Sequence, residues 1–91
     1  MTKKELLRKY NGHVAELRKI INAFDLMPGA PSSEFDKLVH KILNELNKEA
    51  DKQKIISILK SELVITYGFY ENEFDATAIA DRVIQWWNSK M

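Results

Sequence analysis

Apolar residues recur at intervals of three and four positions along most of the chain. This spacing places them on one side of an α-helix, because a helix completes a turn about every 3.6 residues. It predicts four amphipathic helices over about residues 3–25, 33–47, 51–67 and 75–89. Four such helices joined by short links give a compact all-α domain over residues 1–91, as an up-down bundle or an irregular variant of one.

The first helix contains a sequence that is typical of a turn, Asn11-Gly12. The apolar stripe nevertheless keeps its phase from Tyr10 to Val14 across this pair. One helix is therefore expected, weakened at the glycine by about 1 kcal/mol relative to alanine. A break at Asn11-Gly12 is the alternative.

The remaining helix boundaries carry residues suited to them. Two prolines and a glycine within residues 28–31 end the first helix, because this sequence cannot continue one. Serine or aspartate caps the start of a helix, and glycine ends one in the left-handed conformation. The expected boundary residues are Ser32 or Ser33 before the second helix, Asp51 before the third, Gly68 after the third and Asp75 before the fourth.

Apolar residues surround almost the whole circumference of the third helix, which is therefore expected to be the most buried one. Residues 63–70 are rich in β-branched and aromatic side chains and alone resemble a strand. No second convincing strand exists to pair with them, so a helix is favoured.

The composition supports one small domain and excludes several classes of protein. The chain has 91 residues, 45% of them hydrophobic and 30% charged, with no cysteine and a net charge of +1. Disulfide frameworks and thiol chemistry are thereby excluded. The longest uninterrupted apolar run is Leu63 to Ile65, too short to span a membrane. No targeting segment is recognisable, so a cytoplasmic location is expected.

The small net charge results from the cancellation of larger local charges. Residues 1–24 hold six bases and two acids, whereas residues 25–47 and 67–91 each sum to −2. The first helix is therefore expected to dock near the acidic stretches at 25–36 and 71–75. A solvated helix surface explains its bases best, and weak nucleic-acid binding through them is an alternative.

Few residues suggest catalysis. His13 lies on the apolar stripe and is expected to be a partly buried, hydrogen-bonded core residue, and His40 is spaced to pair with Asp36 on a helix surface. No metal-ligand spacing and no glycine-rich phosphate loop occurs in the sequence. A protein without enzymatic activity, cofactor or metal is expected. The alternative is a small enzyme or metal-binding protein that uses His13, Asp25 or Asp36.

The strongest indication of a partner is aromatic. Trp86 and Trp87 point about 100° apart on a helix, so Trp87 is expected in the core and Trp86 at its edge or in an interface. The acids beside the proline-rich loop could converge on a basic group or a cation, although caps and helix dipoles explain them better. Phe69, Tyr70 and Phe74 on the preceding connection are expected to extend the same apolar surface as Trp86. The candidate partner-binding residues are Trp86, Phe69, Tyr70, Phe74, Asp25, Met27, Glu34 and Asp36.

Three short motifs carry a resemblance to a family: Phe24-Asp25-Leu26, then Pro28-Gly29-Ala30-Pro31, then Glu34-Phe35-Asp36. With Tyr67-Gly68 further on, residues 14–87 resemble the YugE-like family, a domain of unknown function in small bacterial proteins. The resemblance implies an all-α fold and a cytoplasmic bacterial protein, and it supplies no catalytic residue.

The sequence thus predicts a non-enzymatic helical module that binds another protein, either a small regulator or an immunity-type protein that neutralises a toxin. The partner is unidentified, nucleic acid and membrane are not expected, and a weak homodimer is allowed.

Overall fold

Four α-helices account for most of the computed structural model, which describes residues 3–31 and 33–90, with the backbone alone for residues 4–8. No strand occurs in this part of the chain, which confirms the all-α prediction. The elements are α1 (Lys3–Ala23), α2 (Asp36–Asn47), α3 (Lys52–Ser61), the π-helix η1 (Glu62–Thr66), the short 3₁₀-helix η2 (Glu71–Glu73) and α4 (Ala76–Asn88).

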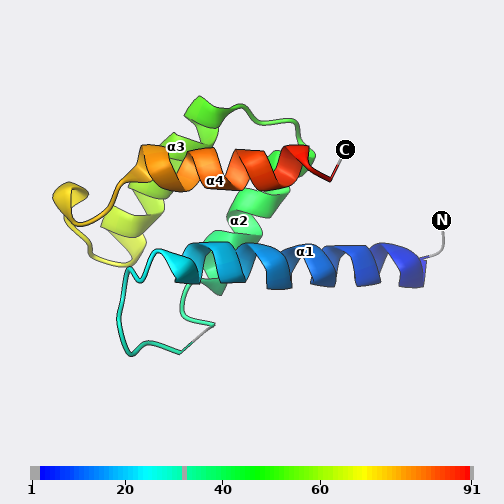
Figure 1. Cartoon of the computed structure of the whole chain (residues 1–91), viewed down its shortest axis with the longest axis horizontal. Coiled ribbons are helices and arrows are strands. Elements are labelled where there is room, and N and C mark those ends of the chain that lie inside the picture. Colours follow the sequence, from blue (N-terminus) through cyan, green and yellow to red (C-terminus); the bar gives the residue numbers. More distant parts are fainter. Residues whose placement is uncertain (1–2, 32, 91) are drawn as a thin grey trace.

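The helices cross rather than run up and down in one bundle. Helices α1 and α4 lie side by side and antiparallel, while α2 and α3 cross behind them (Figure 1). Residues 24–31 and 33–35, which connect α1 to α2, and residues 68–75 lie at one end of the molecule (Figure 1). Helix α1 begins and α4 ends on the opposite side (Figure 1). The fold is therefore an irregular four-helix arrangement, with overall dimensions of 43 × 28 × 20 Å.

Helix α1 is continuous through Asn11-Gly12, as the phase of its apolar stripe predicts. Val14, Leu17 and Ile21 of this stripe are buried. Gly12 is exposed, and a β-carbon at this position would have no neighbour within 4 Å. Because the glycine costs only about 1 kcal/mol there, burial of the stripe on both α2 and α4 outweighs it.

The core is centred on α2, so the prediction that the third helix is the most buried was wrong. Helix α2 contributes five buried apolar side chains, whereas the predicted third helix contributes four, three from α3 and Leu63 from η1. The apolar circumference of the third helix is interrupted where α3 passes into η1, and Ile65 faces the solvent. The buried residues of α2 are Leu38, Val39, Ile42, Leu43 and Leu46.

A π-turn explains why Ile65 is outside. Ile65 lies one heptad after the buried Ile58 and would face the core in a regular α-helix. The Tyr67 amide instead donates to the Glu62 carbonyl five residues back, at 3.1 Å. This bond widens the turn and shifts the following side chains around the axis. Gly68 then ends the helix with a φ of 76°, as predicted.

Two aspartates begin helices as expected, whereas the start of α2 differs. The Asp51 and Asp75 carboxylates accept from the amides of Lys54 and Ala78, at 2.9 and 3.0 Å. The predicted caps of α2 lie before its start, Ser33 in the preceding turn and Ser32 outside the described residues. The N-cap position is occupied by Phe35, which makes no capping bond. Packing fixes this helix start, because the Phe35 ring is buried.

Ion pairs connect the helices across their surfaces. Arg18 of α1 holds Asp36 of α2 through two 2.8 Å hydrogen bonds, which confirms that the first helix docks near the acids at 25–36. No ion pair joins α1 to residues 71–75 among the described residues. The predicted pair between His40 and Asp36 was wrong, because Arg18 takes the carboxylate. The His40 ring instead lies 2.7 Å from the Tyr10 hydroxyl.

Helix η1 is held on α2 by charge. Lys41 of α2 contacts the Glu62 carboxylate, which also accepts from the Thr66 hydroxyl at 2.8 Å. The hydrogen bond from Lys41, followed by that from Thr66, lowers the pKa of Glu62. The carboxylate is therefore ionised at neutral pH and continues to fix the turn that presents Ile65.

Glu49 carries backbone strain at the end of α2, because its φ is 63°. The next amide, of Ala50, donates to the Glu45 carbonyl at 3.0 Å. Glycine is the usual residue in this pattern. We expect Glu49→Gly to stabilise the fold by about 0.5–1 kcal/mol, because glycine adopts this conformation without steric cost.

Thermal unfolding followed by circular dichroism measures the effect, which corresponds to roughly 2–8 °C in Tm for a domain of this size. Glu49→Ala is the control, since it removes the same carboxylate and keeps the β-carbon. Equal Tm values for the two variants would contradict the explanation.

Candidate protein-docking face

The two connections at one end of the molecule are joined by aromatic rings. The Phe35 ring lies 4.9 Å from the Tyr67 ring and 6.3 Å from the Phe69 ring, between centroids. Phe69 in turn lies 6.4 Å from Phe74. These contacts join the two connections, and we call residues 24–31, 33–35 and 64–75 at this end of the molecule the loop-end face (Figure 1).

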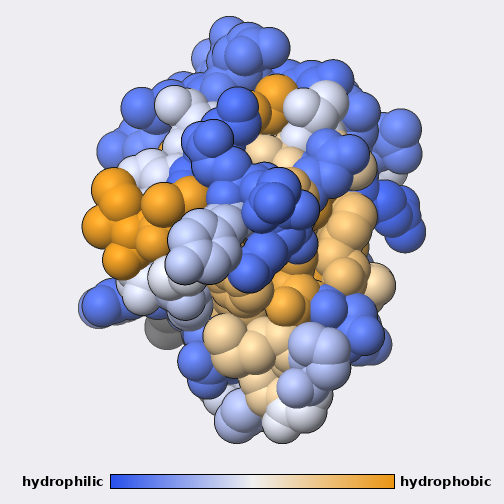
Figure 2. All heavy atoms as spheres, turned by 90° about the vertical axis from the view of Figure 1, so that its left-hand side faces the viewer, coloured by the Kyte–Doolittle hydropathy of each residue, from blue (hydrophilic) through white to orange (hydrophobic). Residues whose placement is uncertain are grey.

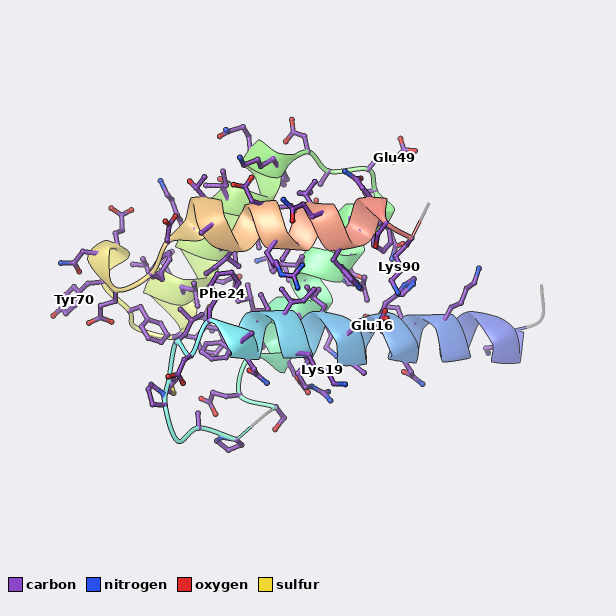
Figure 3. All side chains as sticks on the ribbon, viewed as in Figure 1. Glu16, Lys19, Phe24, Glu49, Tyr70 and Lys90 are labelled. Carbon is purple, nitrogen blue, oxygen red and sulfur yellow. The ribbon has the colours of Figure 1, made fainter. Side chains whose placement is uncertain are left out.

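Two large apolar side chains protrude from this face. Ile65 is 80% exposed and Tyr70 is 74% exposed, and they are the exposed large hydrophobic residues of the described chain. Tyr70 points away from the helices at the tip of the molecule (Figure 3). Figure 2 shows apolar atoms at several places on this side of the protein, between hydrophilic ones. Ile65 and Tyr70 are five residues apart in the same segment of the face, and exposed tyrosine and branched apolar side chains are common at binding surfaces.

A hollow of about 260 Å³ opens in the proline-rich loop of the same face. Phe35 and Met27 form part of its wall, and Asp25 stands at its edge with a φ of 51°. Its other lining residues are Asn22, Leu26, Gly29, Ala30 and Pro31. The hollow is large enough for one side chain of a partner and smaller than the usual site for a drug-sized ligand.

The loop-end face is electrically negative. It holds five carboxylates and no basic residue, and all five are exposed: Asp25, Glu34, Glu71, Glu73 and Asp75. The negative charge also affects the pKa of the Tyr67 hydroxyl. Burial raises the pKa of its hydroxyl, and Glu62, Glu34 and Asp36 raise it further because negative charges oppose a phenolate.

The structure unites most of the aromatic candidates but separates Trp86 from them. Phe69 and Phe74 are half-buried beside the exposed Tyr70. Trp86 lies ten residues after Ala76 on α4. Because a helix rises by about 1.5 Å per residue, Trp86 is roughly 15 Å further along the axis. The expectation that Trp86 and residues 69–74 form one surface was wrong, because α4 carries them at its two ends.

Trp86 belongs instead to a contact between α1 and α4. Its ring and that of Trp87 both meet His13 edge to face, at 5.8 and 5.5 Å. Lys90 lies over the Trp86 ring at 5.6 Å and pairs with Glu16 (Figure 3). The hydrogen bond from Lys90 lowers the pKa of Glu16. His13 is partly buried, as its position on the stripe predicts, and both tryptophans are half-buried at the core edge.

The candidate acids do not form a metal site. Asp36 is held by Arg18, while Asp25 and Glu34 are exposed on the loop-end face. Among the described residues, no group of three or more histidine and acidic side chains could hold a metal ion. Of the two explanations for these acids, a role in the helix start fits Asp36, the first residue of α2.

Two further features were missed from the sequence. The outward position of Ile65 depends on the π-turn. The one sign of it in the sequence is that the apolar residues of the predicted third helix cover more than one helix face. A cleft of about 500 Å³ also lies between the α2–α3 link and the end of α4. Its walls include Glu49, Leu46, Ile84 and Trp87, which no local pattern brings together.

Comparison with protein-family models, curated proteins and solved structures found no match. The resemblance to the YugE-like family therefore stays a prediction. Across the described residues, every helix is too short or too polar to cross a membrane.

Proposed function

We propose that this protein is a non-enzymatic helical module that binds another protein through the loop-end face, as a regulator or an immunity-type protein. The observation that carries the proposal is the pair of protruding side chains, Ile65 and Tyr70, on a surface that a π-turn and a glycine-ended helix hold in place. Exposing these two apolar side chains to water is unfavourable. A partner that covers them would remove this free-energy cost.

The residues around Ile65 and Tyr70 also favour the binding of a partner to the loop-end face. The aromatic contacts of Phe35 fix both connections relative to the helices, so the face changes little on binding. Side chains anchored in this way lose little conformational freedom when a partner arrives, which favours affinity. The hollow beside Met27 gives a partner a place to insert a side chain of its own.

We expect the double variant Ile65→Ser and Tyr70→Ser to reduce partner binding at least tenfold. Truncating a central interface residue commonly costs about 1–2 kcal/mol or more. A tenfold change in Kd corresponds to about 1.4 kcal/mol. Immobilised protein exposed to extract of the source cells measures this loss by quantitative mass spectrometry of the retained proteins.

The matched control is Gln53→Ser with Asn47→Ser, two exposed uncharged positions on either side of the α2–α3 link, away from the loop-end face (Figure 1). Both double variants should keep the wild-type circular dichroism spectrum. Retention of the same proteins by wild type, test variant and control would rule out the loop-end face as the docking site.

A further inference from the structure

The loop-end face lies in the parts of the chain that lack positive charge. No lysine, arginine or histidine occurs in residues 20–36 or 61–81, although the chain holds 14 lysines and arginines. These two segments come from distant parts of the sequence, and the fold brings them together through Phe35, Tyr67 and Phe69. The bases that border them lie on helices at Lys19, Lys37, Lys60 and Arg82. The fold therefore concentrates negative charge at one end of the molecule.

Three carboxylates follow the protruding Tyr70 along the chain, and two more lie on the other connection. Tyr70 precedes Glu71 and Glu73, which the 3₁₀-turn η2 holds beside it, and Asp75 follows at the start of α4. Asp25 and Glu34 lie on the other connection, where Asp25 lines the hollow. An apolar centre with charged groups at its margin is the usual composition of a protein interface, and here the margin has one sign.

We propose that the partner presents a positively charged protein surface with an apolar recess. Lysines and arginines at the rim of the recess face the acids, and the recess receives Ile65 and Tyr70. This proposal rests on the docking function proposed above. A partner of this kind gains electrostatic attraction from acids that no basic residue of the face neutralises, in addition to covering apolar surface.

The same charge argues against other occupants. A second copy docked through the same face would oppose five carboxylates with five more, and like charges across an interface are destabilising. Nucleic acids and acidic membrane surfaces carry negative charge as well, so the face repels them. A weak homodimer through this surface is therefore not expected.

Site-specific crosslinking tests the chemistry of the partner. A photoreactive benzoylphenylalanine replaces Tyr70 in one sample and Gln53 in the other, in the full chain within its source cells. We expect capture from position 70 to exceed capture from position 53 at least tenfold, and the captured peptides to be rich in lysine and arginine. An acidic or neutral captured segment, or a second copy of this chain, overturns the basic-partner proposal and leaves the docking function standing. Equal capture from both positions overturns the docking function itself.

Charge reversal of single residues completes the test once the captured partner is purified. Glu73→Lys changes the face, and Glu49→Lys makes the same change in net charge at the other end of the molecule, far from Tyr70 (Figure 3). We expect Glu73→Lys to slow association by roughly tenfold at low salt and Glu49→Lys by less than about twofold. The difference should shrink at high salt, where charges are screened beyond roughly 3 Å at about 1 M. Equal effects of the two variants would overturn the proposal.

Discussion

Phe35→Ala is expected to destabilise the protein by about 3–5 kcal/mol, the usual cost of removing a buried aromatic ring. Phe35 is 4% exposed and packs on both Tyr67 and Phe69. Its loss leaves a cavity where the two connections meet and removes the packing that fixes the start of α2, which has no side-chain cap. Urea denaturation followed by circular dichroism measures the change.

Phe35→Leu is the control for this result, because it keeps a large apolar side chain and loses only the aromatic contacts. Its cost should be clearly smaller, and the loop-end face should remain ordered. A small cost for Phe35→Ala, below about 1 kcal/mol, would show that the ring does not hold the two connections together.

Two isoleucine truncations should differ by at least about 1.5 kcal/mol in the free energy of unfolding. Ile79 of α4 is fully buried. Ile79→Ala is expected to cost about 2–5 kcal/mol through lost burial and the cavity that remains. Ile65 is 80% exposed. Ile65→Ala should therefore change the free energy of unfolding by no more than about 0.5 kcal/mol.

The comparison uses the same chemical change at both positions, so helix propensity and side-chain size cancel to a first approximation. Equilibrium unfolding of both variants in one buffer gives the result directly. A large cost for Ile65→Ala would mean that Ile65 supports the fold, and its exposure would no longer indicate a residue displayed for a partner.

Local sequence patterns determine much of this fold, so much of it could be predicted from the sequence. The apolar stripes located all four helices, and Asp51, Asp75 and Gly68 mark boundaries because each acts within a few residues of itself. The start of α2 could not be located in this way. Phe35 is held by rings that are more than thirty residues away, and no local rule contains that contact.

The candidate site was predictable in part for the same reason. Tyr70, Phe69 and Phe74 are neighbours in the sequence, so their grouping was visible. Ile65 was not recognised, because the widened turn of η1 depends on hydrogen bonds that interrupt the helical period. The prediction that Trp86 shares a surface with these residues was wrong, because the length of α4 separates them. Trp86 has an aromatic side chain in common with them but not a position in the fold.

The positions of the start of α1 and the end of α4 have a practical consequence. Helix α1 begins and α4 ends on the side of the molecule away from the loop-end face, along a long axis of 43 Å (Figure 1). An affinity tag, a fluorescent protein or a bead joined before α1 or after α4 therefore leaves that face open to the solution. Tethering by either end should give the same partner affinity, so a sensor chip can carry the protein in both orientations as an internal check.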